Sequence, residues 1–270
     1  MELQELYQWI ELQPEIIEKL KQSEKEVDLF SIKEQLDGLM DIQSAPLAYE
    51  SLRELFQDDK EHIKMLYCQL ECARRIYARY REKNIPHVYF TDTMKCFSRF
   101  IAECGKKNGS FFFDRGWWTY RQISMNLFRI GELEYQFREY EGENVIALHI
   151  PSDADFSKER VDASLEEASD FFRRFYSEYK YDKYICNSWL LSQELSPFLS
   201  EKSNIRDFQQ RFDIVKESRE DREFIEWLFQ KPVDTSYGEL PEITGLQKKI
   251  KRLLLNNGTV GSACGIMKKK

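Results

Sequence analysis

The chain has 270 residues, of which 42% are hydrophobic and 14% aromatic, so it can build the core of one large domain or of two ordinary ones. Its net charge of −7 argues against a surface made for binding nucleic acid or an anionic membrane. Its apolar runs fall far short of the roughly 18 residues that a membrane span requires, so we expect no nucleic-acid partner and no membrane.

Two features predict a cytoplasmic protein. Five glutamates fall within the first 18 residues, which a secretory signal peptide would not carry. The six cysteines are too sparse for a disulfide framework, so we expect all of them to stay reduced.

Cys68 and Cys72 lie one helical turn apart, but no second closely spaced pair of ligands accompanies them. Packing is therefore favoured over zinc binding, and we expect no metal.

Helical periodicity dominates about the first 105 residues. The clearest helix is predicted over residues 60–83, and a second apolar stripe runs from Phe90 to Cys104. Turn residues in the segment 105–109 predict the end of this second helix. We therefore predict a helical N-terminal domain over residues 1–122.

A dense aromatic segment, residues 111–120, closes this half of the chain. Clusters of large rings usually serve packing, which makes the segment a seam between two domains. The alternative makes Trp117 and Trp118 one wall of an acceptor pocket at the domain junction, a common place for ligands. The residues leave both interpretations open.

The second half, residues 123–270, has a mixed α/β pattern. It begins with a strand, a tight turn, a strand, a long amphipathic helix and a strand, predicted at residues 127–137, 141–144, 145–150, 161–175 and 184–190. A hairpin followed by a βαβ unit brings the end of the second strand beside the start of the helix, where small anions often bind. Further helical pieces and strands alternate after it, predicted at residues 192–210, 211–216, 221–230, 243–253 and 259–267. The fold expected here is a mixed sheet flanked by helices.

Several motifs are shared with one group of proteins. They are Trp117-Trp118 with Arg121-Gln122, Leu127-Phe-Arg-Ile-Gly-Glu-Leu133, Leu148-His-Ile-Pro151, Ser188-Trp-Leu-Leu191, Ser203-Asn-Ile with Phe208-Gln209 and Phe212, and Leu246-Gln247. Over nearly its whole length the chain resembles bacterial proteins classed as acyltransferases. These have a helical N-terminal domain and a C-terminal domain similar to the GNAT superfamily of acyl-CoA-dependent acyltransferases.

The resemblance implies an acyl-CoA co-substrate, acetyl-CoA or a similar thioester. In GNAT enzymes the pantetheine arm of coenzyme A pairs with a strand that splays from its neighbour, and the pyrophosphate sits on backbone N–H groups at the start of the next helix. Mapped by order, the splaying strand is 145–150 and the opposing strand is 183–188. The cofactor-binding residues implied in this way are Ile150, Pro151, Ser152, Ser157 and Lys158.

The segment 151–160 departs from the GNAT pattern. Active GNAT enzymes usually carry a glycine-rich turn there, which lets the backbone approach the phosphates, whereas this segment has no glycine and contains Asp153 and Asp155. Those carboxylates would repel a pyrophosphate. The region 192–204 also lacks the tyrosine that serves as general acid in many GNAT enzymes. Either the cofactor binds differently, or the site is not a standard acetyl-CoA site.

Three residues at the ends of the two strands are the candidate catalytic groups. His149 could accept a proton from an acceptor amine, because an imidazole can take up a proton near neutral pH; the alternative is a hydrogen-bonded histidine that holds the loop. Asn187 and Ser188 could orient a carbonyl group or a water, and a strand-end cap is the alternative. Cys186 has no visible base to activate it, so buried packing is favoured over a nucleophile.

Three functions fit these features. The first is acyl transfer from an acyl-CoA to an amine-type acceptor, a small molecule or a peptide, by direct attack in a cleft between the two strands. The second is a catalytically inactive GNAT-like module that binds a peptide or metabolite, which the missing glycines and tyrosine favour. The third is an interaction protein whose helical domain is the working surface. We favour the first, and the sequence leaves the oligomeric state open.

Overall fold

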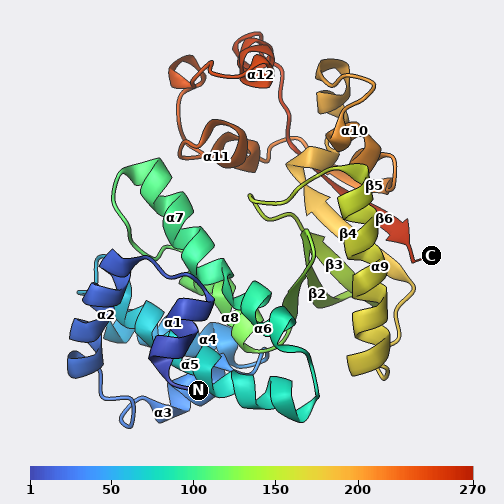
Figure 1. Cartoon of the computed structure of the whole chain (residues 1–270). Coiled ribbons are helices and arrows are strands. Elements are labelled where there is room, and N and C mark those ends of the chain that lie inside the picture. The colour runs from blue at the N-terminus through green and yellow to red at the C-terminus, as the bar shows by residue number, and fades with distance from the viewer. Residues whose placement is uncertain (270) are drawn as a thin grey trace. The chain divides into compact units, whose positions relative to one another are not determined.

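The computed structural model describes residues 1–269 and falls into two compact units, Met1–Ile130 and Gly131–Lys270. The first unit is helical apart from one short strand at its end, and the second contains strands of a mixed sheet with helices around them (Figure 1). The mixed α/β fold class predicted above is therefore confirmed.

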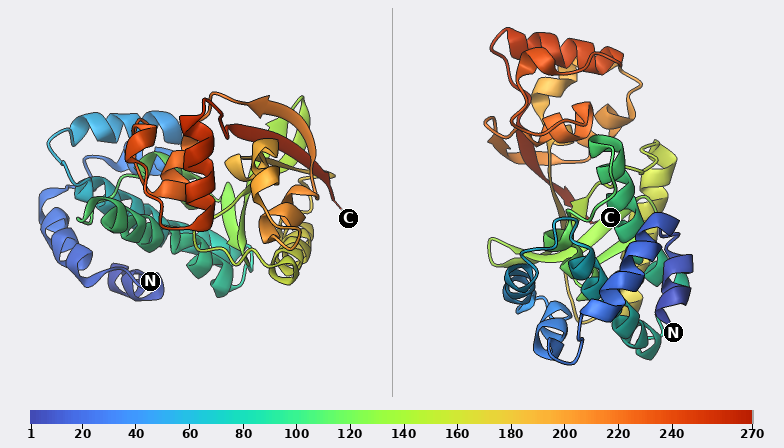
Figure 2. Two further views of the ribbon diagram at one scale, coloured as in Figure 1. Left: turned by 90° about the horizontal axis from the view of Figure 1, so that it is seen from above. Right: turned by 90° about the vertical axis from the view of Figure 1, so that its left-hand side faces the viewer.

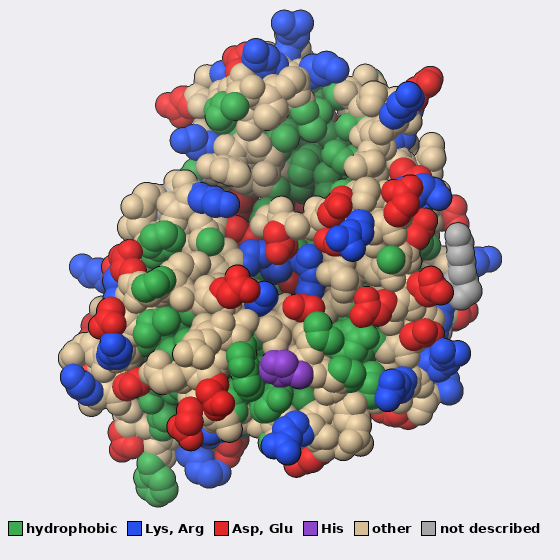
Figure 3. Space-filling view, in the orientation of Figure 1, with side chains coloured by type: hydrophobic (Ala, Val, Ile, Leu, Met, Phe, Trp, Pro, Cys, Tyr) green, Lys and Arg blue, Asp and Glu red, His purple; other side chains and the backbone are tan. Residues whose placement is uncertain are grey.

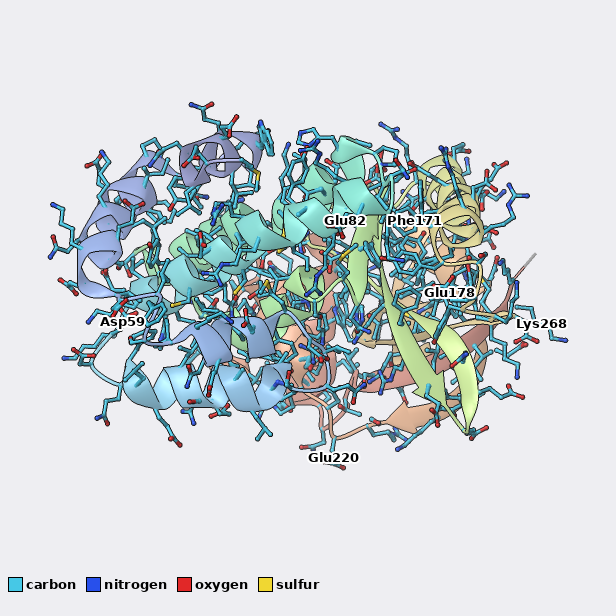
Figure 4. All side chains as sticks on the ribbon, turned by 90° about the horizontal axis from the view of Figure 1, so that it is seen from below. Asp59, Glu82, Phe171, Glu178, Glu220 and Lys268 are labelled. Carbon is cyan, nitrogen blue, oxygen red and sulfur yellow. The ribbon has the colours of Figure 1, made fainter. Side chains whose placement is uncertain are left out.

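Eight helices occur in the described part of the first unit. They are α1 (Leu3–Trp9), α2 (Pro14–Glu26), α3 (Lys33–Leu39), α4 (Ala45–Leu55), α5 (Ile63–Glu82), α6 (His87–Met94), α7 (Cys96–Asn108) and α8 (Gly116–Ile123). The longest, α5, contacts α1, α2, α3, α6 and α8, because buried residues cover most of its circumference. The carboxylate of Asp59 accepts the N–H of Lys64 at 2.6 Å and so caps the start of α5, while Glu82 ends it (Figure 4). The helix predicted over 60–83 is thus confirmed.

Helix α7 runs further than its glycines suggested. The segment 105–109 was expected to be a turn, but α7 continues through Gly105 and ends at Gly109, whose φ of 73° is left-handed. A Cβ at Gly105 would lie 2.4 Å from Cε1 of Phe111, so the missing side chain makes room for that ring. The expected early stop was wrong because Gly105 serves packing inside the helix.

The strands form one sheet with the order β1-β2-β3-β4-β6-β5. Their bounds are β1 (Leu127–Ile130), β2 (Leu133–Tyr140), β3 (Glu143–His149), β4 (Lys183–Ser188), β5 (Asp213–Ser218) and β6 (Ser262–Lys268). The β2–β3, β4–β6 and β5–β6 pairs are antiparallel, and β3–β4 is parallel. Helix α9 (Lys158–Phe175) makes the crossover between the two parallel strands and covers one face of the sheet (Figure 1).

Two turns differ from the sequence-based expectation. The continuous strand predicted over 127–137 is interrupted at Gly131, whose φ is +57° and whose missing Cβ would lie 3.0 Å from the Cβ of Ser164 on α9. The β2–β3 turn contains only Glu141 and Gly142, both with positive φ, whereas four turn residues were expected. Both central residues at positive φ are typical of the tight hairpin turn that matches strand twist.

Alternation along the strands gives the sheet two different faces. Tyr135 of β2 lies on the face covered by α9, where its ring centroid is 6.3 Å from that of Phe172. The opposite face carries a small apolar cluster of Val145, Ala147 and Ile185.

The chain after β4 forms short helical segments. They are the 3₁₀ helices η1 (Trp189–Leu191), η2 (Gln193–Phe198) and η3 (Tyr237–Glu239), and the α-helices α10 (Asn204–Gln209), α11 (Glu223–Phe229) and α12 (Gly245–Leu255). Pro197 lies inside η2 and lacks a donor N–H, which is consistent with the short 3₁₀ geometry. α11 and α12 pack with η2 and η3 around an apolar cluster of their own, beside the sheet (Figure 2).

Candidate functional site

The parallel strands β3 and β4 separate at their carboxyl ends. Their register has three pairs, of which Leu148 with Cys186 is the last. β4 continues beside β6 as far as Ser188, while the chain after β3 leaves toward α9. The separation therefore begins at His149 and Asn187, two of the three residues predicted to be catalytic.

His149 and Asn187 project from the same face of the sheet. By alternation His149 shares the face of Ala147, and Asn187 shares the face of Ile185, opposite α9. His149 Nε2 lies 2.9 Å from Oε1 of Gln136, on the neighbouring strand β2. When Nε2 carries the proton and donates to this oxygen, the lone pair of the neutral imidazole is on Nδ1.

Glu134 is a candidate that the sequence analysis missed. It stands directly opposite His149 in the β2–β3 register, and only 3% of its surface is exposed. Side chains opposite one another in an antiparallel pair have Cβ atoms about 4.5–5.5 Å apart. No role was assigned to this glutamate from the sequence. The hairpin register and the burial together give it a different position, beside the histidine.

Ser188 has a structural role in addition to any chemical one. Its Oγ accepts the N–H of Leu190 at 3.1 Å and caps η1. This is the strand-end cap that the sequence analysis gave as the alternative role of Ser188. Alternation places it on the face of Cys186, away from His149. Cys186 is buried, and burial raises the pKa of its thiol to about 12, which disfavours a nucleophilic thiolate.

The link from β3 to α9 contains the residues expected to bind the cofactor. β3 ends at His149, so Ile150 lies just outside it; the predicted strand began two residues late and ended one residue late. Pro151 is buried and its carbonyl accepts the N–H of Ala154 at 3.2 Å, whereas Ser152 is exposed. The chain thus turns immediately after the point where the strands separate.

A carboxylate lies in the turn just before α9. Ser157 is the N-cap residue, and its backbone N–H donates to Oδ1 of Asp155 at 2.9 Å. This hydrogen bond holds the pKa of Asp155 below its ordinary value. The N–H of Asp155 donates to Oε2 of Glu132 at 2.9 Å, and Nε of Arg160 lies 3.8 Å from Oε1 of Glu132. Acidic side chains of this chain therefore lie beside the start of the helix, where the helix dipole favours negative charge.

Lys158, the remaining residue expected to bind the cofactor, lies on the first turn of α9. Its Nζ is 3.5 Å from Oδ2 of Asp162, and its side chain is exposed. Asp162 also accepts a hydrogen bond from Arg211, which pairs with Asp207 at 2.6 Å. Lys158 shares its carboxylate with a second cation and can turn toward an added anion at small cost.

Within residues 1–269, no group of three or more His, Cys, Asp and Glu side chains is arranged to hold a metal ion. None of the helices in this part of the chain combines the length and the apolar character needed to cross a membrane.

Two family descriptions match the sequence. The family described as "GNAT-like C-terminal domain" matches residues 127–267, and the one described as "N-acyltransferase N-terminal domain" matches residues 1–125. No functionally curated protein matches the chain.

Solved structures share the fold at low sequence identity. An acyltransferase in complex with decanoyl-CoA and teicoplanin is 19% identical with a TM-score of 0.85, over 100% of this chain and 88% of that one. An acyltransferase in complex with CoA and 10C-teicoplanin is 22% identical with a TM-score of 0.72, over 76% of this chain and 66% of that one. An acyltransferase in complex with decanoyl-CoA is 18% identical with a TM-score of 0.73, over 100% of both chains. Likeness at this level of identity establishes the fold.

Proposed function

This chain belongs to the N-acyltransferase family with a GNAT-like C-terminal domain, and on that premise we propose that it transfers an acyl group from an acyl-CoA to an amine-type acceptor. The observation that carries the proposal is the separation of β3 from β4 immediately before α9. A thioester can enter between the two strand ends, with the anionic end of coenzyme A at a helix start. The CoA and acyl-CoA complexes of proteins with this fold support the same co-substrate.

In this proposal the link between β3 and α9 binds coenzyme A. The backbone of Ile150 and Pro151 lies along the pantetheine arm, where the strands diverge. The N–H groups at Ser157 and the hydroxyl of Ser152 donate to the pyrophosphate, and Lys158 supplies a positive charge. The carboxylate of Asp155 must release the N–H of Ser157 for this to happen, which lowers the affinity but leaves the anion site available.

The chemical step needs a base and a group that stabilises the thioester oxygen. The acceptor nitrogen attacks the carbonyl carbon, the carbon–sulfur bond breaks, and coenzyme A leaves as a thiolate that takes up a proton. His149 accepts the proton of the amine, and its side chain is held by Gln136. Asn187, on the same face, donates its amide N–H to the developing oxyanion. The imidazolium of His149 returns the proton to the leaving sulfur, and Ser188, on the opposite face of the sheet, holds the end of β4 by capping η1.

Glu134 extends this set as a positioning residue. A buried carboxylate opposite His149 stabilises the imidazolium that forms during transfer.

The acceptor is proposed to be the amine of a small molecule or a peptide, and structures of this fold hold a teicoplanin. We further propose a cytoplasmic location, because none of the six cysteines, all within residues 1–269, is joined in a disulfide.

The second candidate function is a binding module without turnover. It is favoured by the segment before α9, where the carboxylate of Asp155 accepts the N–H of Ser157 and would repel a phosphate. Binding of coenzyme A without transfer, or binding of a peptide without coenzyme A, distinguishes this function from the first.

The proposal is tested by thermal unfolding in the presence of acyl-CoA thioesters. A ligand at about 100 times its Kd stabilises the folded state by about 2.7 kcal/mol, which corresponds to a rise in Tm of about 5–10 °C for a chain of this size. Ser152→Glu should abolish the rise, because it adds a negative charge at the phosphates. Ser177→Glu, just beyond the far end of α9, is the matched control and should keep it.

Activity then separates an enzyme from a binding module. We expect His149→Gln to lower kcat about 100-fold or more with little change in the Kd for acyl-CoA, since it removes the base. His87→Gln on α6, in the first unit, should leave kcat unchanged. A folded protein that shows no change in Tm with any thioester contradicts the proposal, and binding without turnover favours the second function.

A further inference from the structure

We propose that the amine acceptor also carries a carboxylate, and that Arg138 of β2 and Lys216 of β5 bind this carboxylate on the face of the sheet opposite α9. The inference rests on the proposed function and adds the chemical class of the acceptor. It follows from a row of side chains that leads from the candidate catalytic residues to these two cations.

The row crosses the sheet from strand to strand. Glu134 stands opposite His149 in the β2–β3 pair, and Asn187 stands opposite Cys264 in the β4–β6 pair. Cys264 in turn stands opposite Lys216 in the β5–β6 pair. Residues that are directly opposite in an antiparallel pair share one face of the sheet. The row therefore runs from the proposed base on β3, through Asn187, to a lysine on the edge strand β5.

Two cations lie near the thiol of Cys264. Burial raises the pKa of this thiol, and the positive charges of Arg138 and Lys216 partly offset that rise. Arg138 is four residues beyond Glu134 along β2, so alternation places it on the same face of the sheet. Its charge and that of Lys216 therefore come close to one residue of the row, although β2 and β5 are not neighbours in the sheet.

Neither of these cations is neutralised by a carboxylate of the chain. Within residues 1–269 Arg138 and Lys216 take part in no ion pair, and both are exposed. Asp213 of β5 shares their face, but it stands opposite Ile266, about 7 Å further along β6 than Cys264. Basic and acidic side chains are interspersed over the part of the surface that Figure 3 displays. Two unpaired cations beside one thiol thus form a local excess of positive charge, which attracts an anion.

The position of Lys216 sets the distance between the amine and the anion of the acceptor. Lys216 is two strands away from Asn187, and neighbouring strands lie about 4.8 Å apart, so the anion binds about 10 Å from the reacting amine. Three residues of extended peptide span about 10 Å. The two oxygens of a carboxylate can accept hydrogen bonds from a guanidinium and an ammonium together. A molecule of the length of a tripeptide, with an amine at one end and a carboxylate at the other, fits these positions.

The test compares triglycine with triglycinamide as acceptors. The two peptides have the same amine and the same length, and they differ in the carboxylate. Each is supplied with the acyl-CoA that stabilises the protein most in thermal unfolding, and the release of the coenzyme A thiol is followed. We expect kcat/KM to be at least about tenfold higher for triglycine, because its carboxylate makes charge-assisted hydrogen bonds that the amide cannot make.

Substitutions of the two cations test the position of the carboxylate. Lys216→Gln and Arg138→Gln should each lower the ratio of kcat/KM for triglycine to that for triglycinamide about threefold, and the double variant should bring the ratio to about one. Both positions are exposed, so the fold is retained. Lys202→Gln, exposed in the segment between η2 and α10, is the matched control and should keep the ratio of the wild type.

Alkylation of Cys264 gives a second readout, which does not depend on turnover. The other five cysteines are buried, so this partly exposed thiol is the one that an alkylating reagent reaches in the folded protein. Saturating triglycine should slow the alkylation of Cys264 in the wild type, and triglycinamide should slow it less. In the double variant of Arg138 and Lys216 the two peptides should have the same effect.

The outcomes separate this inference from the proposed function. Equal kcat/KM for the two peptides overturns the carboxylate site and leaves acyl transfer in place. A preference for triglycine that survives in the double variant overturns the assignment to Arg138 and Lys216. Turnover of neither peptide, by protein whose Tm rises with a thioester, also overturns the inference. A folded protein that responds to no thioester overturns both proposals.

Discussion

In the proposed site, Asp155 is the residue at which the present hydrogen bonds and a bound coenzyme A would compete. Its carboxylate accepts the N–H of Ser157 at the start of α9, and that hydrogen bond lowers its pKa. It therefore stays negatively charged well below neutral pH, in a position that suits a phosphate. A family member without glycines in this segment can still bind the cofactor if the carboxylate moves aside.

Removing this single charge should strengthen cofactor binding. Asp155→Asn keeps an oxygen that can accept the N–H of Ser157 and loses the charge that would repel a pyrophosphate. The Kd for coenzyme A should fall about fivefold at low ionic strength, and the effect should fade in salt. Asp170→Asn, exposed in the last turns of α9, is the control. Unchanged or weaker binding by Asp155→Asn would place the phosphates elsewhere.

At the residue scale the sequence could nominate His149 and Asn187 but not Glu134. A histidine at the end of a strand is visible in the sequence, and alternation gives its face. The position of Glu134 depends on the hairpin register, which a turn of two residues sets differently from the expected four. Its low exposure arises from packing by residues distant in sequence, which no local pattern reports.

Helix α5 carries a buried carboxylate with two cations on its own surface. Glu71 accepts hydrogen bonds from Arg74 at 2.7 Å and from Arg75 at 2.9 Å. Burial of Glu71 by itself raises its pKa, and the hydrogen bonds and charges of the two arginines outweigh that effect, so the pKa lies below its ordinary value. The central helix of the first unit is therefore stabilised by an ion pair that needs the charged form of Glu71.

We expect Glu71→Gln to reduce the free energy of unfolding by roughly 1–2 kcal/mol at pH 7. The expected loss is kept this small because both arginines are about one-third exposed, so that water screens their attraction to Glu71. A folded-state pKa below the unfolded one gives stability that is present above the unfolded pKa and is lost as the pH falls through the folded pKa. The difference between wild type and variant should therefore shrink below about pH 4. Urea unfolding at pH 7 and pH 3.5 measures it.

Glu82→Gln, at the exposed end of α5, is the control for this experiment and should change the stability by less than about 0.5 kcal/mol. A variant at position 71 that matches wild type at pH 7, or a difference that grows in acid, would contradict the assigned ion pair.

At the element scale the long periodic segments were predictable and the turns were not. The stripes of α5 and α9 and the strand β4 follow directly from side-chain spacing. Gly105 and Gly131 both look like turn residues, yet one lies inside a helix against Phe111 and the other breaks a strand against Ser164. The neighbour that decides the role of a glycine lies elsewhere in the sequence.

At the scale of the whole molecule, the mixed α/β class followed from the order of periods and from the family resemblance. The apolar cluster around α11 and α12 did not follow from either. Its side chains come from segments between residues 189 and 260 that are separately short, and the clustering appears only when these segments fold together. The packing of this part of the second unit therefore depends on tertiary structure, while the proposed reaction depends on residues that the sequence already marked.

Hydrogen–deuterium exchange with and without saturating acyl-CoA tests the central claim most directly. The account predicts protection of backbone N–H groups in residues 145–160 and 183–190, where β3 and β4 separate and α9 begins. Coenzyme A without an acyl group should still protect the start of α9. Protection confined to other segments, or none under saturating ligand, would contradict a coenzyme A site at the ends of these strands.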